Sequence, residues 1–223
     1  MDDPDPGAGP DPGPSTACRV AALGGLVGPA AFIGAWLVGG AVAGAGYSPV
    51  DDAISRLAAV DADTRALMTA GFVVFGVSLP AYGVALGRAV PGATWAGAAA
   101  AATGLATLGV ALTPLDCSTL VDQWHAVFAG LGYLTLAATP LLAARPLWRR
   151  GHRLLARLGV ATGAVSGAAL VLTATELPTG VFQRLGLTVT DLWIMVTAAA
   201  LLTGRVGPTA SAVAPTDPAE PAR

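Results

Sequence analysis

The chain has 223 residues, of which 54% are hydrophobic and only 12% are charged, and its mean hydropathy is +0.65. This hydrophobic fraction is higher than the surface of a soluble domain tolerates. It is typical of a protein whose partner is the lipid bilayer. The formal net charge is −2, and the 12 basic residues, all arginine, form no stripe with interleaved aromatic residues. We therefore expect no nucleic-acid partner.

The two ends of the chain differ in composition from the rest. Residues 1–18 are acidic and rich in proline and glycine, and residues 206–223 are similar. Such segments bury too little apolar surface to fold, so both are predicted to be disordered tails around one domain at 19–205. Aspartates stand before the first apolar run, where a secretory signal needs basic residues, so we expect that run to be a permanent span.

Six apolar runs follow in the chain. A helix needs about 20 mostly apolar residues to cross the hydrocarbon core, because its backbone polar groups must be satisfied internally. The runs that approximately meet this test are 20–43, 66–86, 95–112, 126–144, 158–175 and 185–202. The sequence therefore predicts an all-α membrane protein, a bundle of six transmembrane helices.

The arginines predict the orientation of these spans. Basic residues stay on the cytoplasmic side, and a cytoplasmic N-terminus puts nine arginines inside and three outside. Five of the nine lie in the single connection 145–157. We therefore expect a cell-membrane protein with both termini in the cytoplasm, and we call the opposite side the outer side.

The first outer connection contains YSPVDDAISRL at 47–57. Ser48 can cap a helix, and Asp51 falls three residues later, where a carboxylate meets the positive end of the helix dipole. Three apolar residues then share one helical face, namely Val50, Ile54 and Leu57. This pattern predicts a short amphipathic helix on the outer membrane surface, apolar side down. The alternative is that it is a capped, solvated helix with no further role.

Polar pairs four residues apart are expected on that helix, Asp51 with Ser55 and Asp52 with Arg56. The second outer connection repeats the order in TPLD, which ends at Asp116, and the third opens with TELP, which contains Glu176. Three acidic helix exits on one side favour a shared polar surface.

His125 begins the fourth span and follows Asp122 by three residues, so a carboxylate can hold the tautomer of its ring. The alternative is an interfacial or packing histidine. A metal site of Asp51, Asp116, His125 and Glu176 fits ligand chemistry, but their spacing matches no metal motif, and we expect no metal. No motif of a named enzyme is present, so whether this is an enzyme and which cofactor it uses stay open.

Asp191 lies about two turns inside the sixth predicted span, and carboxylates within a membrane are functional candidates by default. Arg184 lies seven residues earlier on the same helical face. Either Asp191 reaches water or a threonine near the boundary, or Asp191 and Arg184 belong to a polar pocket that opens outward.

Four motifs together resemble the family catalogued as domain of unknown function 998, multi-pass proteins of bacteria and archaea. They are YSPVDDAISRL after the first span, PLD after the third, WH at Trp124 and His125, and QRLG at 183–186. The resemblance covers nearly all of the chain between the tails. It implies six spans and no established activity.

The leading hypothesis is an outward-facing polar pocket that binds or acts on a lipid or small amphiphile. The catalytic candidates are His125 as general base, Asp116, Asp51 and Ser55, and the substrate-binding candidates are Arg184, Glu176, Asp191 and Arg56. The alternatives are a non-catalytic scaffold or accessory subunit, and a small transporter. The oligomeric state stays open.

The shared site makes two geometric predictions and the predicted topology makes a third. Arg184 should lie within about 4 Å of one of the outer carboxylates. Ser55 and His125 should line one cavity. Cys18 and Cys117 should lie on opposite sides of a core roughly 30 Å thick, too far apart for a disulfide.

Overall fold

The computed structural model describes residues 16–206, so most of the two predicted tails, 1–15 and 207–223, lies outside the described residues. The described part contains six long helices and one short 3-10 helix. They are α1 (Thr16–Val42), η1 (Ile54–Ala58), α2 (Arg65–Ala89), α3 (Thr94–Leu112), α4 (Thr119–Arg149), α5 (Arg153–Thr173) and α6 (Thr179–Leu202). Each long helix is long and apolar enough to cross a membrane, which confirms the predicted fold class.

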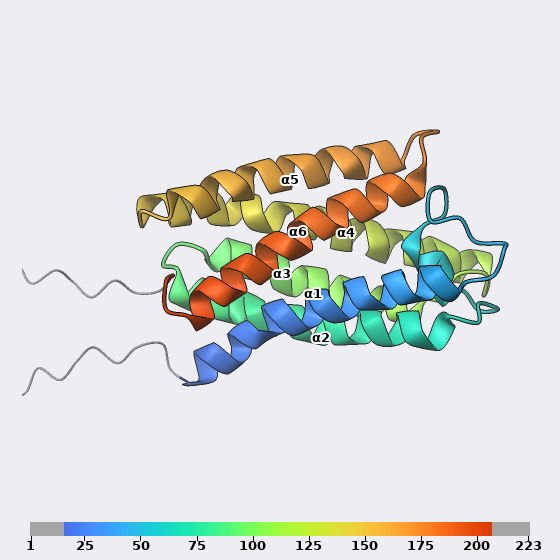
Figure 1. Cartoon of the computed structure of the whole chain (residues 1–223), viewed down its shortest axis with the longest axis horizontal. Coiled ribbons are helices and arrows are strands. Elements are labelled where there is room, and N and C mark those ends of the chain that lie inside the picture. The colour runs from blue at the N-terminus through green and yellow to red at the C-terminus, as the bar shows by residue number, and fades with distance from the viewer. Residues whose placement is uncertain (1–15, 207–223) are drawn as a thin grey trace, which may run out of the picture.

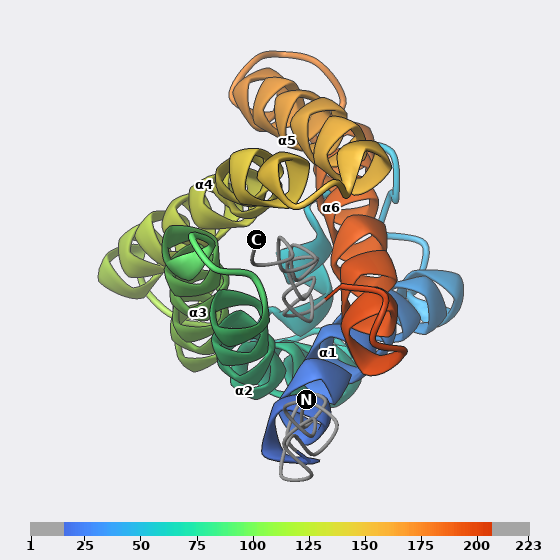
Figure 2. The same ribbon diagram turned by 90° about the vertical axis from the view of Figure 1, so that its left-hand side faces the viewer.

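The six helices form a closed ring. Each helix packs against the next in the sequence, and α6 returns to pack against α1 (Figures 1 and 2). Helix α6 also makes a few contacts with α2 and α4. The protein is thus a bundle in which neighbours along the chain are also neighbours in space.

Close approach of backbones holds the α1, α2 and α3 part of the ring together. A Cβ added at Gly83 of α2 would collide with the carbonyl oxygen of Gly97 on α3. A Cβ added at Gly97 would likewise collide with the carbonyl oxygen of Gly83. A Cβ at Gly24 of α1 would collide with the carbonyl of Ser78 on α2. Within lipid the hydrophobic effect does not drive helices together. Small residues favour their association instead, because they allow the backbones to come into close contact.

The bundle has two distinct ends. The loop end holds the connections 43–64, 113–118 and 174–178, and the arginine end holds the connections 90–93 and 150–152 with the start of α1 and the end of α6 (Figure 1). These are the ends predicted to face outward and inward. Cys18 and Cys117 lie at opposite ends, as predicted.

The predicted amphipathic surface helix in the first connection is not confirmed. The backbone N–H of Asp51 donates to the side chain of Ser48 at 3.2 Å, so the predicted cap forms. The turn does not continue, and η1 begins at Ile54 as a 3-10 helix. Ile54 and Leu57 are 2% and 1% exposed, so they insert into the bundle instead of lying on a membrane surface.

Candidate functional site

A cavity of about 70 Å³ lies below η1. One water needs roughly 10–15 Å³ of such space, so the cavity holds a few waters or the end of one slender molecule. Its walls come from η1 and from every long helix except α5. The lining residues are Phe32, Ile54, Ser55, Phe72, Phe75, Thr103, Thr107, Val110, His125, Phe128, Ala129, Gly132, Tyr133, Leu136, Gln183 and Leu187.

Phenylalanine side chains gather around this cavity. Four of the five phenylalanines of the chain line it, from α1, α2 and α4. The ring centroid of Phe32 lies 5.2 Å from that of Phe75 and 5.9 Å from that of Phe72, within the range of favourable aromatic pairs. None of the lining residues is an aspartate, glutamate or arginine. The cavity therefore suits an apolar or uncharged group.

His125 supplies an unused hydrogen-bond acceptor at the wall of the cavity. It is 5% exposed, and its Nδ1 lies 2.6 Å from the carbonyl oxygen of Thr113. A carbonyl can only accept, so Nδ1 carries the hydrogen, and in the neutral ring Nε2 then keeps a lone pair. This Nε2 is buried and has no hydrogen-bond partner among the described residues.

The predicted role of Asp122 in orienting His125 is wrong. Thr113 is the C-cap residue of α3, and the last carbonyls of a helix lack partners within it, so one of them is available to the ring. The carboxylate of Asp122 instead accepts from the backbone N–H of Asp116 at 3.0 Å. A backbone carbonyl therefore holds the tautomer that a carboxylate was expected to hold.

Ser55 and His125 line the same cavity, as predicted. Sequence reasoning missed the other polar wall residues. Gln183 accepts from the backbone N–H of Ile54 at 2.6 Å and so ties η1 to α6. The hydroxyl of Tyr133 donates to the carbonyls of Phe182 and Gln183 at 3.2 and 3.3 Å. The one feature of the sequence that could have indicated Gln183 was its position in the QRLG motif.

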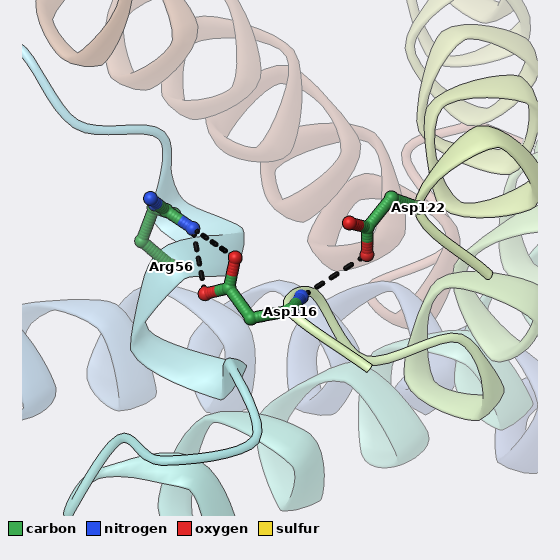
Figure 3. Close-up of polar contacts among 3 residues, drawn as sticks. All are labelled: Arg56, Asp116 and Asp122. Carbon is green, nitrogen blue, oxygen red and sulfur yellow. Dashed lines mark hydrogen bonds and ion pairs between the residues drawn. The ribbon is translucent and has the colours of Figure 1, made fainter. Parts of the chain in front are cut away.

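Arg56, Asp116 and Asp122 join two connections of the loop end (Figure 3). Nη1 of Arg56 lies 2.9 and 2.7 Å from the two carboxylate oxygens of Asp116. Asp116 has a φ of 63°, an uncommon left-handed conformation for a residue with a side chain. The ion pair and the bond to Asp122 help to hold it there. Arg56 and Asp116 thus fasten segment 43–64 to segment 113–118.

The pairs predicted within residues 47–57 are wrong. Asp52 accepts from the backbone N–H of Ser48 at 2.7 Å, so it is not the partner of Arg56. Asp51 accepts from the hydroxyl of Ser48 at 2.8 Å, so it is not the partner of Ser55. Both aspartates close one tight turn, because the helix on which these pairs were expected does not form.

Arg184 was predicted to pair with an outer carboxylate, and this prediction is wrong within the described part of the chain. Its Nη1 donates to the backbone carbonyls of Asp52 and Gly180 at 3.1 and 2.9 Å, and its Nη2 donates to the hydroxyl of Tyr47. The guanidinium also lies 5.5 Å from the ring of Trp36. Burial raises the pKa of the Tyr47 phenol, although the nearby Arg184 charge opposes this shift, so the phenol stays neutral.

The predicted convergence of all these residues is also wrong. Glu176 is exposed in the connection 174–178. Neither Arg56, Asp116 nor Arg184 lines the cavity. Arg56, Asp116 and Arg184 instead brace the loop end by contacts with neighbouring segments. Ser55 and His125 are the two candidates that share this cavity, whereas Arg56 and Asp116 line a separate, open pocket at the loop end.

Asp191 lies deeper than predicted. Helix α6 begins at Thr179 instead of 185, so Asp191 lies halfway along it, about 18 Å from its start. It is fully buried, and neither carboxylate oxygen has a hydrogen-bond partner among residues 16–206. Asp191 does not line the cavity, whereas Leu187, which lies one turn nearer the loop end, does line it. Asp191 therefore reaches neither a boundary nor a threonine, and it shares no pocket with Arg184.

The described residues contain no group of three or more histidine, cysteine, aspartate or glutamate side chains placed to hold a metal ion. Comparison with known proteins gives one result. Residues 26–200 match the family described as "Protein of unknown function (DUF998)". The chain belongs to this family. No curated protein and no solved structure matches it. The family resemblance inferred from the motifs is confirmed, and the protein is a multi-pass membrane protein.

Proposed function

We propose that this protein binds a small amphiphile that carries an alcohol. The hydroxyl end enters the cavity and donates to Nε2 of His125, and the phenylalanines pack against the carbons next to it. The observation that carries this proposal is the buried Nε2, an acceptor without a donor among the described residues, on a histidine of a mostly apolar wall. Leaving such a group unsatisfied costs about 1–3 kcal/mol, which a ligand donor recovers.

The chemistry of the wall supports a neutral headgroup. No carboxylate or guanidinium lines the cavity, so a phosphate or an ammonium there would lack a counter-charge. Arg184, first considered as the anchor of an anionic group, is already bonded to carbonyls and to Tyr47. An alcohol satisfies the open acceptor of His125 without bringing in a charge.

Binding is better supported than catalysis. In a catalytic version the lone pair of His125 would act as general base for the hydroxyl of Ser55, which lines the same cavity. Such a pair is normally oriented by a third group, often a carboxylate. Here Thr113 provides a carbonyl instead, which orients the ring but adds no negative charge.

The scaffold hypothesis remains the second candidate, and one observation favours it. The Arg56 and Asp116 pair and the contacts of Arg184 use three of the six charged candidates to fasten connections. A scaffold needs such bracing and does not need an open acceptor in a cavity. The state of His125 therefore separates the two hypotheses.

Photolabelling of the purified protein in lipid nanodiscs tests the proposal. The probes are a long-chain alcohol that carries a diazirine and the matching diazirine alkane. His125→Phe keeps the size of the side chain but removes the acceptor, and His152→Phe is the matched control at the arginine end. We expect His125→Phe to lower labelling by the alcohol roughly tenfold, the equivalent of one hydrogen bond. Equal labelling of all three proteins by the alcohol would contradict the proposal.

We further propose that the loop end faces outward in the cell membrane, on the basis of the distribution of arginines. Cys117 is exposed at the loop end and Cys18 lies near the start of α1. A membrane-impermeant thiol reagent on intact cells should therefore modify Cys117 and not Cys18. Modification of Cys18 alone would invert the orientation.

A further inference from the structure

The arginine end carries an open groove of about 650 Å³ between α4 and α5. Its floor is apolar and includes Leu141, Val160 and Ala161. Its rim holds Arg145, Trp148 and Arg157. The groove thus combines an apolar channel between two membrane-spanning helices with two guanidinium groups where these helices end.

Trp148 organises the basic rim. The guanidinium carbons of Arg157 and Arg153 lie 5.5 and 5.8 Å from the centroid of its ring, close enough for cation–π contacts. Stacking on a ring face leaves the N–H groups at the edge of a guanidinium available to an acceptor. Trp148 is 46% exposed, and tryptophan prefers the boundary between lipid and water. The rim is therefore placed at headgroup level.

Within residues 16–206 these arginines have no ion-pair partner. The ion pair found among the described residues is that of Arg56 and Asp116, at the other end of the bundle. Three neighbouring cations without an anion repel one another, and an anionic group between them would relieve this repulsion. Arginine binds phosphate through paired N–H groups, which makes a phosphate the best match.

We propose that an anionic phospholipid occupies this groove, with its phosphate between Arg145 and Arg157 and one acyl chain on the floor between α4 and α5. A soluble phosphate would satisfy the rim but leave the floor uncovered, whereas a lipid satisfies both. Basic pockets between transmembrane helices bind acidic headgroups in this way. The site lies at the opposite end from the His125 cavity and does not depend on the function proposed for it.

Lipid retention by the purified full-length protein tests this proposal. The protein is equilibrated with mixed micelles of phosphatidylglycerol and phosphatidylcholine, and the bound lipid is counted by native mass spectrometry. The test variant is R145Q/R157Q, and the control is R88Q/R205Q, which removes the same charge at the same end but outside the groove. We expect a preference for phosphatidylglycerol in the wild type that falls roughly fivefold per arginine in the test variant. The control should keep the preference of the wild type.

A third variant, Ala161→Phe, fills the floor without changing a charge. We expect it to lower retention of phosphatidylglycerol and to leave binding of inorganic phosphate unchanged, and it keeps the test valid if R145Q/R157Q does not fold. Equal loss in the R88Q/R205Q control would show a diffuse charge effect and overturn the proposal. Retention unaffected by both R145Q/R157Q and Ala161→Phe would also overturn it.

Discussion

The two ends of the bundle use their arginines differently. At the loop end Arg56 pairs with a carboxylate, and Arg184 bonds to two carbonyls and a phenol. At the arginine end Arg145 and Arg157 border an open groove without an ion pair to other described residues. The charges of Arg56 and Arg184 are therefore structural, and those of Arg145 and Arg157 are available to a partner. The loop end offers a ligand the neutral cavity beneath its braced connections.

Replacement of Ile54 by alanine should have the largest effect on stability, because Ile54 inserts the first connection into the bundle. It is 2% exposed, and its loss leaves a hole near the cavity, which costs about 3 kcal/mol. Thermal unfolding in detergent measures the change. Val50, which is 50% exposed in the same segment, is the control, and Val50→Ala should leave the midpoint nearly unchanged. Equal shifts would mean that the segment rests on the membrane surface after all.

Arg184→Ala should have the next largest effect. It removes two hydrogen bonds between α6 and the first connection and one within α6, and it leaves two backbone carbonyls without this donor, which we expect to cost about 2 kcal/mol. Arg157→Ala at the other end removes a stacked arginine without hydrogen bonds to described residues and should have little effect. Unfolding midpoints of the two variants compare the ends directly. If Arg157→Ala were the more destabilising change, the contrast between the ends would be reversed.

Asp116→Asn should have the smallest effect. Asparagine tolerates the left-handed backbone at this position, so the substitution removes the charge of the ion pair with little change in strain. Both partners are about half exposed, and such pairs contribute no more than about 1 kcal/mol. The loss should shrink further in high salt, because salt screens exposed charges. A large, salt-independent loss would show that Asp116 has a role beyond the ion pair.

The six spans could be predicted because apolar length is a local property of the sequence. The ends of the helices could not be predicted in this way, because several helices continue through polar residues beyond their apolar runs. Helix α4 runs from Thr119 although its apolar run begins at 126, and α6 begins six residues before its predicted start. This second difference moved Asp191 from near a boundary to the middle of a helix.

The candidate site was only partly predictable, because long-range contacts replaced the local ones. Ser48 caps a turn as expected, but the N–H of Ile54 bonds to Gln183, 129 residues away, and a 3-10 helix forms there. His125 bonds to Thr113 across a loop instead of to Asp122 on its own helix. The phenylalanines of the cavity come from three helices, and a helical spacing relates only Phe72 and Phe75 among them.

The central claim is that His125 offers a bare Nε2 to a ligand hydroxyl. Nitrogen-15 NMR of the histidine side chains in nanodiscs tests it most directly, because the signals of His125 and His152 can be assigned with the two phenylalanine variants. We predict that Nε2 of His125 has the signal of an unprotonated ring nitrogen and shifts when the long-chain alcohol is added, whereas the matching alkane leaves it unchanged. A hydrogen on Nε2, or a signal that does not respond to the alcohol, would contradict the account.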